Sequence, residues 1–276
     1  PEDTSVTLDD IAKNFGDEIA SLVSGITKLG KLKYRGVERY LENLRKMFVA
    51  MAEDIRVMII KFADRIHNLS TLGSLPPQKA YRIALESLEI YAPIAGRLGM
   101  DQMKSMLEDL SFVYVFPKEY QRTVTLHTEK IAGKEQYFHE IQDIATKDIE
   151  AAGIPLISLS GRNKKLYSFY QKLIRKNNDV NKVYDLIAIR AIVPTVADCY
   201  ATLGVLHKLW KPLSGRFKDY ISQPKPNGYQ SLHTTVFAKD NQIVEFQIRT
   251  EDMEEEASFG VAAHWHYDEH GAKAPK

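Results

Sequence analysis

The sequence contains a single cysteine, Cys199, among its 276 residues. One cysteine excludes an internal disulfide and a metal site built from several thiolates, and it favours a reducing, cytoplasmic setting. No apolar run approaches the ~18 residues that a membrane-spanning helix needs. The formal net charge is only +1, so no positive field over the whole molecule attracts nucleic acid. Any recognition of phosphate groups must therefore be local.

The sequence also lacks an initiator methionine, a signal peptide and any internal repeat. It opens with the polar residues Pro1-Glu-Asp-Thr4, and we therefore expect it to be an internal part of a longer protein. Its hydrophobic content of 44% and charged content of 26% are typical of soluble globular proteins. A chain of 276 residues predicts two domains.

The first part of the chain has apolar residues at the three-to-four residue spacing of helices. Helices are predicted over 37–63, 80–92, 98–116 and 119–152. The last of these is long and charged, with Gly133 as a weak point, and it is predicted to be a helical connector. Gly153 and Pro155 mark its end.

Beyond residue 153, short runs rich in Val, Ile and Ala alternate with helical patterns. Strands are predicted over 156–160, 183–193, 232–238 and 242–249, and helices over 164–176, 196–210 and 251–264. Asp240-Asn241 predicts a hairpin turn between the last two strands. The predicted fold class is therefore α+β and multidomain, with an all-helical part followed by a mixed sheet flanked by helices.

The most informative segment is the polar loop 215–233. Pro224, Pro226 and Gly228 exclude a regular helix or a central strand there. Cations suit phosphate groups, and tyrosine rings can stack on a base. The candidate ligands in this loop are Arg216, Lys218, Lys225, Tyr229 and His233. The loop therefore predicts a nucleotide site, although a solvated connector, and for His233 a satisfied histidine at a strand edge, stay open.

A basic turn at 160–168 lies between a predicted strand and a predicted helix. Free backbone N–H groups at a helix start favour an anion, and Arg162, Lys164 and Lys165 supply positive charge. Lys172, about two turns along, can face the same way. A solvated basic helix start is the alternative.

Two carboxylates, Asp185 and Glu245, lie inside apolar strands. A carboxylate in such a place is costly unless it is paired or bound to a metal. On neighbouring strands the two could hold Mg²⁺ through hard oxygens. Structural ion pairs with Arg190 and Arg249 are the alternative.

These segments, with Tyr167-Ser168, Tyr184-Asp-Leu186 and Ala262-Ala-His-Trp265, occur in one order and spacing. Over 156–267 the chain resembles the synthetase domain of the RelA/SpoT family. The resemblance implies a nucleotidyltransferase-like fold and transfer of the β,γ-diphosphate of ATP to the 3′-hydroxyl of GDP or GTP, which makes (p)ppGpp. It implies that Asp185 and Glu245 hold Mg²⁺, that Tyr229 stacks on guanine and that His233 assists at the acceptor.

The same resemblance implies roles for other residues of this half. Substrate binding is implied for Gly161, Arg162, Lys164, Ser168, Lys172, Arg190, Arg216, Lys225, Asn227 and Tyr229, and catalysis for Asp185, Lys218, His233, Glu245 and Gln247. The base that takes the proton of the 3′-hydroxyl is left open between Glu245 and Gln247. The motif Arg216-Phe-Lys-Asp219 is the basic version that the family associates with enzymes that also hydrolyse (p)ppGpp.

The helical part resembles the HD-type hydrolase domain of the same family, which uses Mn²⁺ to cleave the 3′-diphosphate. The resemblance implies that Asp64 is a metal ligand, that Glu2 and Asp3 are catalytic acids, and that Asn68 and Thr71 belong to a nucleotide pocket. The other metal ligands, two histidines and an aspartate, come in the family from segments upstream of Asp64 that this chain lacks. We therefore expect this chain not to hydrolyse (p)ppGpp.

The expected domains are a hydrolase part over 1–117, a connector over 118–153 and a synthetase domain over 154–276. Two other functions stay open. The chain could be a non-catalytic module that senses guanine nucleotides, or its parent could act mainly as a hydrolase. In the family, C-terminal domains outside this region contact the ribosome, and the parent could share that partner.

Overall fold

The computed structural model describes residues 4–30, 49, 54–132, 134–163, 165–183 and 187–263. The predicted site residues Glu2, Asp3, Lys164 and Asp185 lie outside these ranges. Of Arg162 only the backbone is described.

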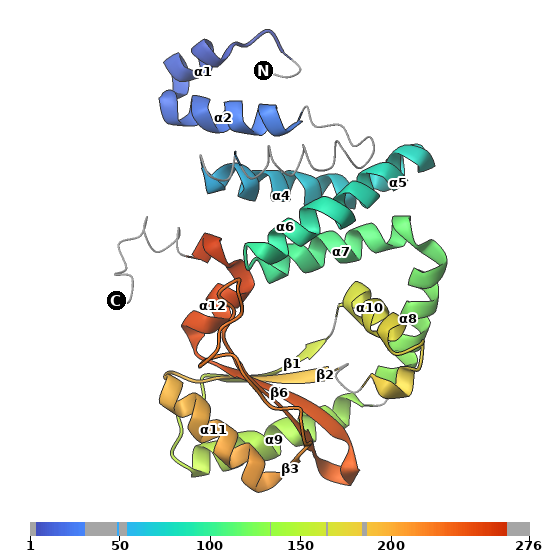
Figure 1. The fold of residues 1–276 in the computed structure, drawn as a ribbon, viewed down its shortest axis with the longest axis vertical. Helices are drawn as coiled ribbons and strands as arrows, with labels where there is room; N and C mark the ends of the chain where they lie inside the picture. Colours follow the sequence, from blue (N-terminus) through green and yellow to red (C-terminus); the bar gives the residue numbers. More distant parts are fainter. Residues whose placement is uncertain are drawn as a thin grey trace.

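The helical half is a stack of helices that ends on the sheet-containing half (Figure 1). Its elements are α1 (Leu8–Phe15), α2 (Asp17–Gly30), α4 (Ile55–Ser70), η1 (Leu72–Ser74), α5 (Pro77–Glu86), a π-helical turn η2 (Ser87–Tyr91), α6 (Ala92–Arg97) and α7 (Asp101–Val115). The Asp54 side chain accepts a hydrogen bond from the backbone N–H of Arg56, which caps α4. The helix predicted over 37–63 therefore contributes only its last part to α4, and most of the rest lies outside the described residues.

The core of this half forms where the apolar faces of α4, α5, η2, α6 and α7 meet. Met58, Phe62 and Leu107 are fully buried there. The predicted helix 98–116 is confirmed as α7, while the predicted helix 80–92 is divided among α5, the π turn and α6.

The stretch predicted as one long helix over 119–152 is two helices. α8 (Pro117–Ile131) and α9 (Glu135–Ala151) are separated close to the predicted weak point at Gly133, which itself lies outside the described residues. α8 packs against α10 (Leu166–Arg175). In α9, Ile141, Ala145 and Ile149 are fully buried against the sheet, so this helix is part of the core of the second half.

The sheet has six strands: β1 (Ser158–Asn163), β2 (Ile187–Ile192), β3 (Lys211–Pro212), β4 (Lys218–Asp219), β5 (Leu232–Phe237) and β6 (Ile243–Arg249). Their order is β1-β2-β6-β5-β3, and β4 pairs with β5. Only β2 and β6 run parallel among these pairs. The strands predicted over 232–238 and 242–249 are confirmed as β5 and β6, and β2 lies within the predicted 183–193. β1 overlaps only the end of the predicted 156–160, and the short strands β3 and β4 were not predicted. Asp240 and Asn241 form the predicted turn with φ of 56° each.

One face of the sheet is covered by α9 and α11 (Val196–Leu209) (Figure 1). Val244, Phe246 and Ile248 of β6 point to that side and are fully buried. Because side chains alternate along a strand, the residues between them point to the opposite face, toward α7 and α10. Cys199 belongs to the buried side, and burial raises the pKa of its thiol to about 12, which keeps it unreactive.

No helix among the described residues is long and apolar enough to cross a membrane.

Two sets of contacts join the halves. Helix α12 (Glu251–Phe259) follows β6 directly and packs against α7. An aromatic cluster also joins the halves. Phe112 of α7 stacks on Tyr170 of α10 with ring centroids 4.8 Å apart. It also makes T-shaped ring contacts with Tyr120 of α8 and Tyr167 of α10.

We expect Phe112→Ala to lower the free energy of unfolding by about 3–5 kcal/mol, because it empties a fully buried ring site shared by three helices. Urea denaturation followed by circular dichroism measures this. Tyr81→Ala is the matched control, since Tyr81 is 46% exposed on α5. A loss for Phe112→Ala no greater than that for Tyr81→Ala would contradict the central place of this cluster.

Candidate functional site

The polar face of the sheet presents three of the predicted catalytic side chains together. Glu245 and Gln247 are two residues apart on β6 and therefore lie on the same face of the sheet. His233 of β5 is the cross-strand partner of Gln247. The Gln247 Nε2 donates a hydrogen bond to Glu245 Oε1 at 2.8 Å, and His233 Nδ1 lies 3.8 Å from the same oxygen. One hydrogen bond from Gln247 therefore orients Glu245, which has His233 beside it and stays partly exposed.

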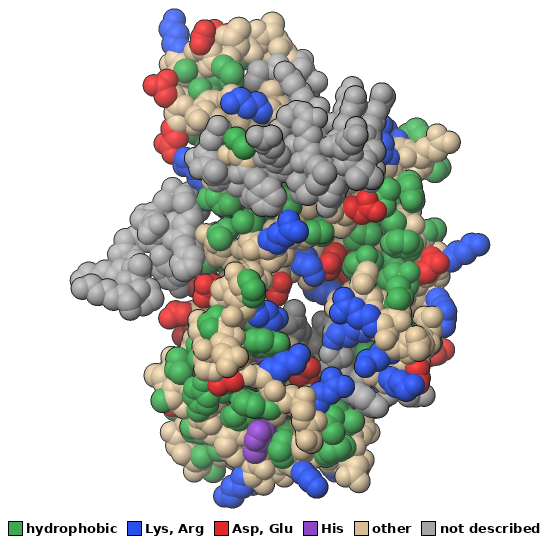
Figure 2. All heavy atoms as spheres, in the orientation of Figure 1, with side chains coloured by type: hydrophobic (Ala, Val, Ile, Leu, Met, Phe, Trp, Pro, Cys, Tyr) green, Lys and Arg blue, Asp and Glu red, His purple; other side chains and the backbone are tan. Residues whose placement is uncertain are grey.

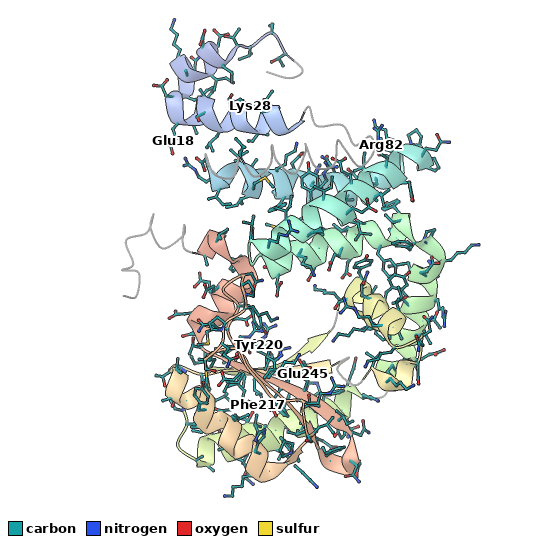
Figure 3. The ribbon with its side chains drawn as sticks, in the orientation of Figure 1. Glu18, Lys28, Arg82, Phe217, Tyr220 and Glu245 are labelled. Atoms are coloured by element: carbon teal, nitrogen blue, oxygen red, sulfur yellow. The ribbon has the colours of Figure 1, made fainter. Side chains whose placement is uncertain are left out.

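These side chains form the floor of a cavity of about 340 Å³ between the sheet, α7 and α10. Figure 3 shows Glu245 and Tyr220 in this region, on the side of the sheet that faces α7. The predicted residues that line the cavity are Ser168, Lys172, Lys218, Lys225, Tyr229, His233, Glu245 and Gln247. The structure thus brings together residues from α10, the 215–233 loop, β5 and β6.

The cavity is locally basic although the chain is nearly neutral. Five lysines line it (Lys104, Lys165, Lys172, Lys218 and Lys225), against three carboxylates (Asp101, Glu108 and Glu245). Figure 2 shows blue side chains gathered around the hollow between the two halves. A polar, cationic cavity that includes tyrosines suits a ligand with phosphate groups and a ring.

A second cavity of about 210 Å³ adjoins the first, since Lys172 and Glu245 line both. Its other charged residues are Arg175, Lys176, Lys182 and Arg216. Arg216 is therefore found in this second cavity and does not line the first. Glu245 therefore lies between two cavities, and basic side chains line each of them.

Tyr229, predicted to stack on a base, is only 6% exposed. Its hydroxyl accepts a hydrogen bond from Arg249 Nη2 at 2.6 Å and is hydrogen-bonded to His233 Nε2 at 2.6 Å. The Lys225 ammonium lies 4.2 Å from the centroid of its ring, a cation–π contact. The Arg249 guanidinium carbon lies 4.9 Å from the same centroid. Stacking of a base on Tyr229 stays a prediction, and a base would compete with these cations for the ring.

Arg249 is a buried side chain that links several residues of this region. It is 2% exposed, donates to Gln247 Oε1 at 3.1 Å, and pairs with Glu254 of α12 at 2.8 Å. Arg190 of β2 pairs with the other oxygen of Glu254. The alternative that Arg249 pairs with Glu245 is therefore wrong. Both arginines use Glu254, which the sequence analysis did not single out because the acidic first turn of a helix is common.

The start of α10 corrects one expectation. β1 continues through Gly161 to Asn163, and the backbone N–H of Tyr167 donates to Asp109 Oδ1 of α7 at 2.9 Å. That N–H group is therefore not free for an anion, because a carboxylate from the helical half already occupies it. Gly161, the β1 residue predicted to bind substrate, and Arg190 instead line a third cavity, of about 400 Å³, beside α7 and α12.

Helix α7 contributes Asp101, Lys104, Ser105 and Glu108 to the main cavity, and the sequence analysis missed all four. Lys104 and Glu108 pair at 3.1 Å with i,i+4 spacing, a pattern that on most helices marks an ordinary surface pair. Burial raises the pKa of the Glu108 carboxyl, and Lys104 opposes that shift. Burial likewise raises the pKa of Asp109. This helix therefore belongs to both halves.

Of the predicted hydrolase residues, Asp64 and Asn68 lie on α4, and Thr71 follows its last residue. Asp64 pairs with Lys61 at 3.2 Å and accepts a hydrogen bond from Asn68 Nδ2 at 3.1 Å. The hydroxyl of Thr71 donates to the carbonyl of Asn68. Within the described ranges, no group of three or more His, Cys, Asp or Glu side chains is arranged to hold a metal ion. Glu2 and Asp3 fall outside these ranges.

We expect Glu108→Gln to stabilise the protein increasingly as pH rises through and above the usual glutamate range. A raised pKa in the folded state means that Glu108 contributes most stability when protonated, and that this contribution is lost as pH rises through its folded pKa. Urea denaturation from about pH 4 to about pH 8 measures the difference between variant and parent. Glu150→Gln, at an exposed position on α9, is the control. A difference that is flat with pH would contradict the raised pKa.

Comparison with known proteins adds two family matches. A model described as "Region found in RelA / SpoT proteins" matches residues 161–272, and an HD domain model matches residues 1–101. The chain is 48% identical over 276 residues, its whole length, to a GTP pyrophosphokinase of Streptomyces antibioticus, of which it covers 33%.

Two further relatives carry different names. The chain is 46% identical over 98% of its length to a probable guanosine-3′,5′-bis(diphosphate) 3′-pyrophosphohydrolase of Synechocystis, covering 36% of it. It is 47% identical over 98% of its length to the bifunctional (p)ppGpp synthase/hydrolase SpoT of Escherichia coli, covering 38% of it. The chain thus spans about a third of the length of the curated relatives that it matches.

Proposed function

Because the chain belongs to the RelA/SpoT family, we propose that its sheet-containing half transfers the diphosphate of ATP to the 3′-hydroxyl of GDP or GTP. The observation that carries this proposal is the main cavity. There the carboxylate of Glu245, on the central strand β6, lies beside His233 and Gln247 in a cavity that is also lined by lysines of α7, α10 and the 215–233 loop. Phosphoryl-type transfer needs positioned phosphates and positive charge near the transferred group, and this arrangement provides both.

The metal in this proposal is Mg²⁺, held by Glu245 together with Asp185. Glu245 fits that role because it presents a partly exposed carboxylate oxygen to the cavity, the hard donor that Mg²⁺ prefers. When bound, the ion neutralises charge on the phosphate oxygens. Asp185 lies outside the described residues, so its part rests on the family motif.

The remaining roles follow from contacts. Lys172, Lys218 and Lys225 bind phosphate groups in the main cavity, and Arg216 extends this surface into the adjoining one. Gln247 donates to Glu245 and accepts from Arg249. Those bonds support a role for Gln247 in orienting Glu245. We do not propose Gln247 as the base, because a neutral amide side chain does not take up a proton near neutral pH.

We expect Glu245→Gln to lower the turnover of diphosphate transfer by at least about 100-fold while nucleotide binding is largely kept. The substitution removes the carboxylate charge that is proposed to hold Mg²⁺ beside the diphosphate being transferred. The assay incubates the chain with ATP, Mg²⁺ and GDP or GTP and separates the nucleotides by anion exchange. AMP should appear in step with a more highly charged guanine nucleotide.

The control for this variant is Glu150→Gln, which should transfer at the parental rate. A Glu245→Gln variant that keeps turnover would contradict the proposed role of Glu245. A parent chain that binds guanine nucleotides without producing AMP would instead favour a non-catalytic sensing module.

We expect Tyr229→Phe and Tyr229→Ala to separate the two roles of this side chain. Loss of the hydroxyl alone leaves one buried N–H of Arg249 without that acceptor and costs about 1–3 kcal/mol of stability. Loss of the ring also removes a stacking surface, which is worth about 1–3 kcal/mol for a base. Calorimetric titration of GDP measures the binding. If Tyr229→Ala binds GDP as tightly as Tyr229→Phe, Tyr229 does not stack on the base.

A second candidate activity is removal of the 3′-diphosphate from (p)ppGpp, which the HD domain match favours for the parent protein. For this chain the expectation of no such activity stays a prediction, as does the assignment of Asp64 to Mn²⁺. A cytoplasmic setting suits a protein that uses ATP and GTP. A ribosome contact of the parent is likewise a proposal carried by family membership alone.

A further inference from the structure

The corner between α6 and α7, residues 96–99 of the helical half, lies directly against the 215–233 loop of the sheet-containing half. The Asn227 side chain donates from Nδ2 to the carbonyl oxygen of Gly96 at 3.1 Å. Just beyond α12, the backbone N–H of Val261 donates to the carbonyl oxygen of Leu98 at 3.1 Å. Residues 96–99 are thus hydrogen-bonded to two separate segments of the second half.

The backbones at this crossing approach so closely that two glycines face each other. Gly99 has φ of +75°, and a Cβ there would lie 3.0 Å from the carbonyl oxygen of Asn227 and 3.1 Å from the Cα of Gly260. Gly260 has φ of +55°, and a Cβ there would lie 2.1 Å from the carbonyl oxygen of Leu98. Gly260 therefore has no room for a side chain, and a Cβ at Gly99 fits only if its neighbours move by a few tenths of an ångström. Both residues also have the positive φ that favours glycine.

The part of the loop that contacts this corner, residues 225–229, includes two residues that line the main cavity, Lys225 and Tyr229. The N–H of Gly228 donates to the carbonyl of Lys225 at 2.9 Å, and the N–H of Lys225 donates to the carbonyl of Tyr229 at 3.2 Å, so 225–229 is one tight turn. On its other side, a Cβ at Gly228 would meet the Glu256 carboxylate of α12 at 3.0 Å. Asn227 and Gly228 are therefore held between the α6–α7 corner and α12.

We propose that the α6–α7 corner of the helical half is a positioning element of the cavity and that Gly99 is its positioning residue. Fixing Asn227 fixes the turn, and the turn places the Lys225 ammonium and the Tyr229 ring at the cavity wall. Gly99 has no side chain and does not line the cavity, so it acts through the segments that it touches, the loop at Asn227 and Gly260 after α12. That this cavity takes a guanine nucleotide rests on the function proposed above; the positioning of the loop does not.

Gly99→Ala tests this in the full chain, with Gly153→Ala as the matched control. Gly153 has φ of +74°, nearly that of Gly99, but no atom lies within 4 Å of a Cβ built there. Both variants thus carry the same backbone strain, and only Gly99→Ala pushes on the loop. Hydrogen exchange of peptides covering 222–231, without nucleotide, should be at least about fivefold faster in Gly99→Ala than in Gly153→Ala.

The kinetic readout is the split between KM and kcat. Positioning of the loop predicts that Gly99→Ala raises the KM for GDP or GTP about tenfold, with a smaller change in kcat and in the KM for ATP. Equal exchange of 222–231 in the two variants would overturn the proposal. So would faster exchange that extends equally over α9 and α11, because that result shows a general loss of stability.

A second variant covers the case in which Gly99→Ala does not fold. Asn227→Ala removes the bond to Gly96 without adding volume, and it should speed exchange of peptides covering 96–101 from the other side of the contact. Unchanged exchange there would also overturn the proposal. If the parent chain makes no (p)ppGpp, the proposed function fails, yet the exchange experiments still decide whether the corner positions the loop.

Discussion

Burial of one face of the sheet on α9 and α11 is the constraint on which the rest of the structure depends. Val244, Phe246 and Ile248 are fully buried on that side, and a strand places every second residue on the opposite side. Glu245, Gln247 and Arg249 are therefore delivered to the other face by the same hydrophobic pattern. A slip of one residue in β6 would bury the carboxylate and expose the phenylalanine, so the core and the site share one register.

The opposite wall of the cavity comes from a helix that is continuous with the other half. α7 contributes Leu107 to the helical core, Phe112 to the aromatic cluster, Asp109 to the start of α10 and Glu108 to the cavity. A single helix therefore packs against described elements of both halves. The division into hydrolase part, connector and synthetase part stays a prediction, and these contacts show how closely the described parts are joined.

Sequence reasoning reached the sheet and much of the site because both depend on local patterns. Alternation in 242–249 identified β6 and singled out Glu245 as an acid among apolar neighbours, and the two prolines and Gly228 identified the loop. It could not reach Glu254, Asp109 or Lys104, because their roles come from contacts across distant elements. An acidic helix start and an i,i+4 ion pair look alike in sequence whether they face solvent or a cavity.

The cation over the ring of Tyr229 has a consequence for how tightly any planar ligand binds. The Lys225 ammonium lies over this ring, and a cation–π contact is worth about 0.5–2 kcal/mol. The affinity of a stacking ligand is then a difference between two energies, one for the ring it gains and one for the ammonium it displaces. A ligand with a phosphate group recovers that second energy by giving the displaced ammonium a new partner, whereas an uncharged base does not. If a base stacks on Tyr229 as predicted, this turn would therefore favour a nucleotide over the corresponding free base.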